Sequence, residues 1–364
     1  MISLLGRWQT EKGDAYIVSL VRMILGVLLL LSAMREMDEH GAGGYFGDSF
    51  HIPIVPEALV PSRDLFTLLV AIECGLAVLV TIGRASRPAL LASALIGIFL
   101  LSCDRLRYHN NRYALFLFAF ILAFAPCDRA FFFRRGGAPA LAREGDLWAQ
   151  RLAQLQLAVI YVASGGSKLL DPDWRQGRVI GDRLVRSTAL AISQGVPIEL
   201  MRFLSDPMVA SALSKLAILT EISLAVALFV PRTRFFALWW GVMFHVTIEL
   251  TSKVELFGWL SLSIYALFAR PTLRERTLFY DDARASGVFV SRAVRLLDWL
   301  VRFELRADAS ATNGRGFVVV ERDGSVAAGA LAVARIARAI PVLFPLSVPL
   351  FLVTAPIKKT PGAR

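Results

Sequence analysis

The chain has 364 residues, of which 56% are hydrophobic and 19% charged, and its formal net charge is +11. Soluble domains carry nearer a quarter charged residues, so this composition excludes an ordinary soluble protein and indicates a polytopic membrane protein. The positive excess is typical of cytoplasmic loops and lipid headgroups. Because aromatic and basic residues do not interleave, we expect no nucleic-acid partner. The three cysteines and four histidines are scattered, so we expect neither a disulfide nor a metal site.

Eight apolar runs are candidates for membrane-spanning helices, although several are shorter than the ~20 residues that a straight span needs. They occupy about residues 15–34, 65–82, 88–103, 113–127, 151–167, 208–230, 235–251 and 254–269. The sequence therefore predicts an all-α polytopic membrane domain over residues 1–275.

Basic side chains in alternate loops predict the orientation of these spans. Arginines lie between spans two and three, four and five, and six and seven, and again after span eight. The acidic loop 35–64 and the 168–207 connection fall on the opposite side. Because loops rich in Lys and Arg stay in the cytoplasm, we expect a multi-pass protein of the inner (plasma) membrane with both termini cytoplasmic.

The pattern changes beyond residue 276, where strands at 277–281 and 317–321 alternate with helices at 288–305 and 327–339. Asp323-Gly324 is a hairpin turn signal. The order β-α-β-β-α predicts a small cytoplasmic α/β domain over 276–364.

The last apolar run, 339–355, contains three prolines. A ninth span here would place Lys358, Lys359 and Arg364 on the outer side of the membrane, whereas basic residues usually stay in the cytoplasm. We therefore favour a segment that lies on the membrane surface or forms a hairpin.

Ionisable side chains inside the predicted spans are costly and are therefore functional candidates. They are Arg22, Glu73, Glu221, His245 and Glu249, and the last two share a helix face. In one interpretation they pair helices, with Arg22 bound to Glu73 or Glu221. In the other, Glu221 and His245 line a polar cavity or proton path.

Two polar segments fall on the predicted outer side. Residues 103–113 are dense in hydrogen-bonding groups, and Lys168 ends an apolar helix. The first is either a solvated loop or part of a polar site shared with Lys168. Lys168 is either an anchor whose stem reaches the interface or a base tuned by burial.

The motifs at these positions resemble those of the vitamin K-dependent γ-carboxylase superfamily, whose bacterial relatives are the horizontally transferred transmembrane (HTTM) domain proteins. Lys168 followed by Asp171, Pro172, Asp173 and Trp174 is similar to the family's G-x-K-[KL]-x-D-x-D-W.

Other matches follow the same chain order over about residues 10–275. Arg22 to Gly26 resembles R-x-x-x-G, Asn110 to Tyr113 resembles N-N-H-x-Y, and Pro126 to Arg129 resembles P-C-D-R. Glu221 and His245 match a glutamate and a histidine of later spans.

This resemblance implies that Lys168 holds the position of a lysine that deprotonates vitamin K hydroquinone, so a quinone or another lipophilic molecule is a possible substrate or cofactor. Arg112 stands where the family has a histidine, and only short outer loops replace a large substrate-binding domain, so we do not expect γ-carboxylation of glutamate. The candidate catalytic residues are Lys168, Arg112 and His109. The candidate substrate-binding residues are Asn110, Asn111, Tyr113, Asp171, Asp173, Trp174, Arg22, Glu221 and His245.

The tail resembles the thioredoxin-like DCC family at Phe279 to Asp282, Arg292 to Leu297 and Asp323-Gly324. In that alignment the family's two cysteine positions fall on Gly287 and Val290, so dithiol exchange is impossible. The resemblance implies a small α/β thioredoxin-like domain without redox activity, which would serve as a docking or structural module for a cytoplasmic protein partner.

Two functions follow from these patterns. The first is a membrane enzyme that acts on a quinone or another lipophilic substrate with Lys168 as base, either carboxylase-like or a quinone-dependent oxidoreductase. It predicts a quinone-sized cavity reached by Lys168 and residues 109–113. The second is a non-catalytic membrane scaffold or assembly factor. A transporter is disfavoured because no inverted repeat is evident.

Overall fold

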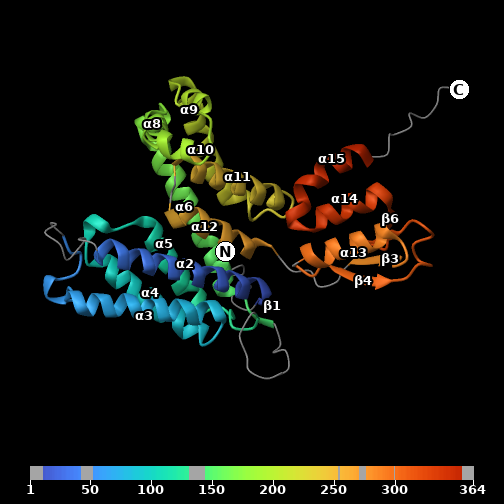
Figure 1. Cartoon of the computed structure of the whole chain (residues 1–364), viewed down its shortest axis with the longest axis horizontal. Helices are drawn as coiled ribbons and strands as arrows, with labels where there is room; N and C mark the ends of the chain where they lie inside the picture. Colours follow the sequence, from blue (N-terminus) through green and yellow to red (C-terminus); the bar gives the residue numbers. More distant parts are fainter. Residues whose placement is uncertain are drawn as a thin grey trace. The chain divides into compact units, whose positions relative to one another are not determined.

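The computed structural model describes residues 11–41, 52–130, 144–252, 255–269, 276–298 and 300–354. The chain divides into two compact units, Met1–Phe268 and Ala269–Arg364. The first unit is almost entirely helical, whereas the second contains a four-stranded sheet (Figure 1).

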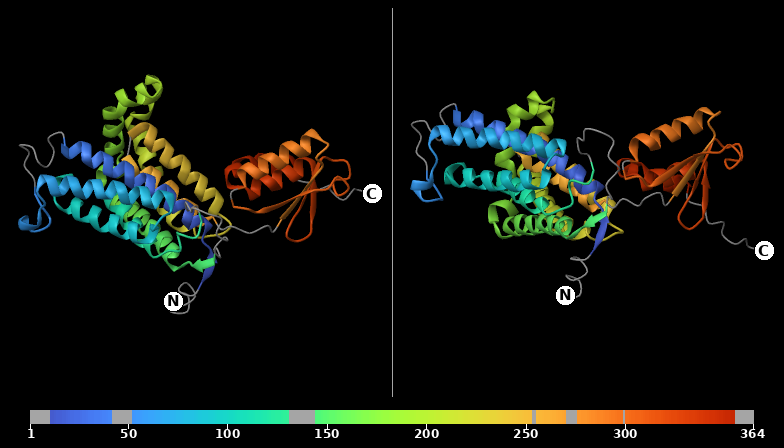
Figure 2. Two further views of the ribbon diagram at one scale, coloured as in Figure 1. Left: turned by 60° about the horizontal axis from the view of Figure 1, so that its bottom comes forward. Right: turned by 90° about the horizontal axis from the view of Figure 1, so that it is seen from below.

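Four helices run side by side in the first half of the helical unit (Figure 2). They are α2 (Tyr16–Gly41), α3 (Arg63–Ile82), α4 (Ser86–Ser102) and α5 (Asn110–Ala123). Local sequence sets the ends of α3: the Ser62 hydroxyl accepts a hydrogen bond from Leu65 N, and Gly83 ends the helix at φ 81°. A two-stranded ribbon pairs β1 (Lys12–Asp14) with β2 (Glu144–Asp146).

Seven α-helices are described in the second half of this unit. They are α6 (Trp148–Leu170), α7 (Pro172–Arg175), α8 (Arg178–Ser193), α9 (Ile198–Leu204), α10 (Pro207–Ala227), α11 (Arg234–Ser252) and α12 (Glu255–Tyr265). Helix α6 packs along α10, and α12 contacts both α2 and α5, so it links the two halves. Within the second half, Gln150 and Gln154 of α6 hold the residues after α12, because both side-chain amides donate to the Leu267 carbonyl, at 2.8 and 2.6 Å.

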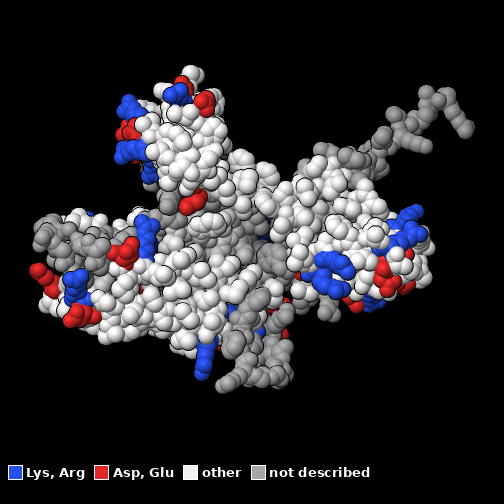
Figure 3. All heavy atoms as spheres, in the orientation of Figure 1, with Lys and Arg blue, Asp and Glu red and all other residues white. Residues whose placement is uncertain are grey.

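Three described helices are long and apolar enough to cross a membrane, namely Tyr16–Asp38, Arg63–Ile82 and Pro207–Ala227. The apolar helices Ser86–Ser102, Asn110–Ala123 and Leu256–Phe268 are shorter. Figure 3 shows charged side chains gathered over α8 and α9, whereas the visible flanks of α2 and α3 carry few. The prediction of a mainly helical fold is confirmed, and three described helices are able to cross a membrane by length and composition. The count of eight spans stays a prediction.

The described residues of the second unit form four strands and three α-helices. They are β3 (Arg276–Tyr280), α13 (Ala285–Leu297), β4 (Phe303–Ala307), β5 (Phe317–Val320), β6 (Val326–Ala328), α14 (Gly329–Ala339) and α15 (Phe344–Thr354). The strand order is β4-β3-β5-β6, with β3 and β4 parallel and the other pairs antiparallel. The core of this unit is formed by Leu278, Val294, Phe303, Val319 and Ile336, among others.

The β5–β6 hairpin turns where the sequence predicts it. Gly324 has φ +76°, and the Asp323 carboxylate accepts a hydrogen bond from Ser325 N at 2.9 Å.

Two predicted helices of this unit are too long. The helix predicted at 288–305 ends at Leu297, and β4 follows, because Phe303, Glu304, Leu305 and Arg306 alternate between apolar and polar as a strand does. The helix predicted at 327–339 begins at Gly329, because the residues before it pair with β5 as β6.

The apolar run 339–355 is also broken. Helix Gly329–Ala339 meets Pro341–Ser347 at 115°, and α15 contains Pro349. The bend lies at the start of the run, and α15, which forms most of the rest, has 11 residues, fewer than the ~20 that a straight span needs. The residues that would decide its polarity, Lys358, Lys359 and Arg364, lie outside the described residues.

Candidate functional site

Lys168 forms an ion pair with Glu221 between α6 and α10. Its Nζ donates to Glu221 Oε1 at 2.5 Å and to Ser164 Oγ at 2.8 Å. The Lys168 side chain is 17% exposed and that of Glu221 7% exposed. Lys168 is therefore held by a buried carboxylate rather than free at the interface.

Small residues bring the two helices close enough for this pair. A Cβ on Gly165 would lie 2.8 Å from Ile222 Cγ1 and 3.3 Å from Glu221 Cβ, so α10 packs directly on the glycine. The Ser164 hydroxyl also donates to Glu221 Oε1, at 3.2 Å. Small residues at helix contacts allow such close approach, which explains the run from Ser164 to Ser167 just before the lysine.

The Asp-Pro-Asp-Trp turn places an aromatic ring beside Lys168. The Asp171 carboxylate caps α7 by accepting from Asp173 N at 2.8 Å, and Pro172 occupies the first helical turn. Lys168 Nζ then lies 4.9 Å from the centre of the Trp174 ring, which is cation–π range. Asp173 itself pairs with Arg178 at 3.1 Å, with both side chains exposed.

This turn is also fixed against α10. The Ser214 hydroxyl donates to the Trp174 carbonyl. Gly177 has φ +81°, and a Cβ there would lie 2.3 Å from Ser211 N, so only glycine fits at this contact. The sequence signature is thus a rigid support for Trp174, and neither of its aspartates contacts Lys168 in the described residues.

A second polar group lies next to this pair. The Tyr161 hydroxyl is 2.7 Å from His245 Nε2 and also hydrogen-bonds the Tyr265 hydroxyl. These side chains come from α6, α11 and α12, and all three residues are at least 97% buried. Tyr161 and Lys168 are seven residues apart on one face of α6, so the two polar groups lie on the same side of that helix.

The sequence predicts a functional role for His245 but none for Tyr161 or Tyr265. One signal was available for Tyr161, because it lies three residues before Ser164 and seven before Lys168, on the same helix face. Nothing comparable marks Tyr265, whose place depends on the packing of α12.

Arg112 lies in a different cluster. It begins α5 with Asn110 and Asn111, and it pairs with Glu36 of α2. His109 occupies the position before this helix without capping it, and Tyr113 packs against Tyr108 with ring centres 6.1 Å apart. The structure thus brings Lys168 together with Glu221, Trp174 and His245, whereas Arg112 has its own carboxylate.

Among the described residues Arg22 forms no ion pair with Glu73 or Glu221, the two partners that the helix-pairing interpretation named for it. Its guanidinium donates to the carbonyls of Val80, Thr81, Cys127 and Ala130 at 2.6–3.2 Å. The reason is local: α3 ends beside it, and the last carbonyls of a helix lack partners within the helix. Glu221 pairs with Lys168 instead, and Glu73 accepts a hydrogen bond from Ser93.

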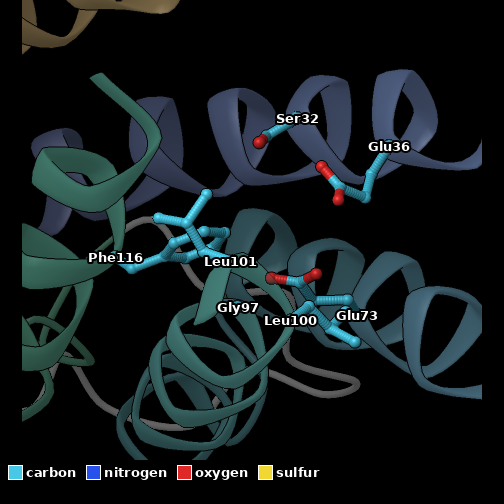
Figure 4. Close-up of a pocket in the computed structure, with 7 residues that line it drawn as sticks. All are labelled: Ser32, Glu36, Glu73, Gly97, Leu100, Leu101 and Phe116. Atoms are coloured by element: carbon cyan, nitrogen blue, oxygen red, sulfur yellow. The ribbon is translucent and has the colours of Figure 1, made fainter. Parts of the chain in front are cut away.

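A small cavity lies between α2, α3, α4 and α5 (Figure 4). It has room for about one water molecule. Its lining residues are Ser32, Glu36, Glu73, Gly97, Leu100, Leu101 and Phe116. Lys168 does not line it, so the quinone-sized cavity expected beside Lys168 stays a prediction. In the part of the chain that the structure describes, no three His, Cys, Asp or Glu side chains could hold a metal ion together.

A family model described as the HTTM domain matches residues 11–272 of the chain. No curated protein and no solved structure matches the chain. The matched region includes both the Lys168 cluster and the Arg112 cluster, and it ends before β3, so the likeness of the tail to the DCC family stays a prediction. Because the family model covers more than half of the sequence, the chain belongs to the HTTM domain family, a family of typically membrane-associated proteins.

Proposed function

We propose that this protein is a membrane enzyme that removes a proton from the hydroxyl group of a lipophilic, phenol-like molecule such as a hydroquinone, with Lys168 as the base. The observation that carries the proposal is the 2.5 Å contact between Lys168 Nζ and Glu221 Oε1. A lysine can act as a base only as a neutral amine, and this contact supplies an acceptor for its proton.

The proposed step moves two protons. First, the Lys168 ammonium passes one proton to the Glu221 carboxylate, which leaves a neutral amine and a neutral acid. Burial raises the free energy of the ionised ammonium–carboxylate pair because both charges lose water. The neutral amine–acid pair is therefore closer in free energy to the ionised pair here than it is in water. The amine then takes the proton of the substrate hydroxyl, so that a phenolate forms next to a new ammonium group.

Neighbouring side chains support this chemistry. Glu221 Oε2 is buried and accepts no hydrogen bond from the residues that the structure describes, so it has capacity for a proton. Trp174 holds the ammonium of Lys168 by a cation–π contact. Tyr161 and His245 extend the polar group into the helix bundle.

The alternative is a membrane scaffold or assembly factor in which the same pair only joins α6 to α10. One observation favours it: the ion pair is already satisfied, with Ser164 as a third partner. The two functions differ in whether a small molecule binds at the pair.

The proposal includes a location in the inner (plasma) membrane with both termini in the cytoplasm, which the arginine-rich loops support. It also includes a docking role for the second unit toward a cytoplasmic protein.

Mass spectrometry of the lipids and quinones retained by the purified protein tests the enzyme function. We expect a quinone-class molecule with the wild type and a loss of at least tenfold in Lys168→Met combined with Glu221→Gln, which removes both charges and keeps side-chain volume. Lys215→Met is the matched control, because Lys215 is exposed on α10. If the wild type retains no such molecule, or the double variant retains as much, the scaffold function is supported instead.

A further inference from the structure

Helix α13 of the second unit exposes large apolar side chains on the face that turns away from the sheet. Its inner face contains Gly287, Ser291 and Val294, which are buried, and Val294 belongs to the core of the unit. On the opposite face Phe289 is 72% exposed and Leu296 81% exposed. These two residues are seven apart, or about two helical turns, so their side chains form one apolar ridge. The outer face of a surface helix usually presents polar side chains instead.

Two arginines accompany this ridge. Arg292 lies between Phe289 and Leu296 on the same face, Arg295 lies along its edge, and both are exposed. Figure 3 shows basic side chains on the part of the second unit where Figure 1 draws α13. The ion pairs in the described part of this unit use other arginines, namely Arg276, Arg284 and Arg306.

The α13 sequence contains no Asp or Glu. The acidic residues nearest to it in the chain are Asp281 and Asp282 before the helix and Asp298 after it. Asp281 pairs with Arg284, and Asp298 accepts a hydrogen bond from Phe303 N. The exposed face of α13 is therefore both apolar and basic, and it complements a surface that has anionic groups above an apolar layer.

A bilayer surface has this chemistry. Amphipathic helices that lie on a membrane insert Phe and Leu side chains at the boundary between headgroups and acyl chains, and their basic side chains attract anionic headgroups. Two observations favour lipid over a protein partner. The chain belongs to a membrane-associated family and has described helices long enough to cross a bilayer, so lipid lies within reach of the second unit. The same unit also contains α15, which is apolar apart from Ser347 and Thr354.

We propose that α13 docks on the membrane surface, with Phe289 and Leu296 inserted among the lipid headgroups and with Arg292 and Arg295 bound to lipid phosphates. The partner is a leaflet that contains anionic lipid. This docking goes beyond the proposed reaction and does not depend on Lys168. It holds the second unit against the bilayer by a contact of its own, in addition to the covalent connection to the helical unit.

Hydrogen–deuterium exchange of the full-length protein in lipid nanodiscs tests this docking, because a helix held against a bilayer opens and exchanges more slowly. The discs contain phosphatidylcholine alone or mixed with phosphatidylglycerol. We expect peptides from residues 285–297 to exchange roughly tenfold more slowly in the anionic discs, since each arginine at an anionic surface strengthens binding about fivefold. Raised salt should reduce this difference between the discs.

The arginines are tested by Arg292→Gln combined with Arg295→Gln. This double variant should remove the difference in exchange between the two kinds of disc. Arg315→Gln is the matched control, because Arg315 is an exposed arginine of the same unit outside α13, and it should leave the difference unchanged. An equal effect of the control would mean that only the total charge of the unit matters, which would contradict docking by α13.

The apolar ridge is tested by Phe289→Ser combined with Leu296→Ser. We expect α13 of this variant to exchange faster than that of the wild type in anionic discs, because the arginines alone hold it less tightly. Val326→Ser is the control, since Val326 of β6 is 62% exposed and lies outside the proposed contact. Unchanged exchange in the peptides of β3 and β5 shows that a variant is folded.

The wild type alone already decides whether lipid is the partner. Equal exchange of α13 in the two kinds of disc would overturn the proposal. Equally slow exchange in detergent without lipid would also overturn it, because another part of the protein would then cover the helix. Protection that follows the number of protein molecules per disc, and not the anionic lipid, would indicate a second copy of the chain instead.

Discussion

Two ion pairs among the described residues of the helical unit differ in their access to the surroundings. The lysine side chain of the Lys168–Glu221 pair is 17% exposed. In the Arg112–Glu36 pair the arginine is 5% exposed and the glutamate 11% exposed. A partly accessible pair can exchange a proton with a substrate, whereas a more enclosed pair mainly joins the helices that carry it.

The largest difference between the two clusters is expected for Arg112→Met. This change removes the guanidinium that pairs with the buried carboxylate of Glu36, so we expect a loss of about 3–5 kcal/mol in the free energy of unfolding. Chemical unfolding in detergent measures it. Arg105→Met, at an exposed site before α5, is the control, and a loss as large there would mean that the ion pair is not the cause.

Lys168→Met should lower the free energy of unfolding by less, about 3 kcal/mol. The carboxylate of Glu221 loses its cation, but it lies beside a position that is partly accessible. Adding Glu221→Gln should recover most of that loss, since no charge then remains unpaired. A double-mutant cycle measures the coupling. If the two single losses simply add, the pair does not stabilise the fold.

Gly165→Ala tests the packing that creates the Lys168 pair. The new methyl group would lie 2.8 Å from Ile222 Cγ1, so α6 and α10 must separate, at a cost of about 1–3 kcal/mol. Gly166→Ala is a matched control in the next position, because a Cβ there meets nothing within 4 Å. We expect that variant to unfold at the same or a higher temperature than the wild type; equal losses in both would exclude close packing as the reason for Gly165.

The smallest effect is expected for Tyr161→Phe, which removes a hydroxyl group that hydrogen-bonds both His245 and Tyr265. We expect a loss of about 1–2 kcal/mol, because two buried partners lose a hydrogen bond. Phe244, which is next to His245 but has no hydroxyl, provides a control as Phe244→Leu. Retention of bound quinone by Tyr161→Phe would show that this group supports structure rather than substrate binding.

Local patterns in the sequence predict several parts of this molecule. Composition predicts helices in a membrane, the Asp323-Gly324 pair predicts its hairpin, and the position of Lys168 at the end of an apolar helix predicts an unusual lysine. Each of these features depends on residues that are close together in the chain, so it can be predicted from a single sequence.

Partners distant in sequence could not be predicted in this way. The choice of Glu221 for Lys168 depends on how α6 packs on α10, and Gly165 fixes that contact only once the helices meet. Arg22 was assigned a carboxylate because opposite charges attract, but the ends of nearby helices offered it carbonyl groups instead. The strand β4 was missed because a strongly amphipathic helix directly precedes it.

Close packing of the main chain around Gly287 in the second unit limits which side chains this position can hold. A Cβ at this position would lie 2.3 Å from the Asp281 carbonyl oxygen and 2.5 Å from that of Gly316. The resemblance to the DCC family puts its first cysteine here, yet the main chain now occupies the space that a side chain would need. Placing cysteines at 287 and 290 would therefore damage the fold before it created a thiol pair.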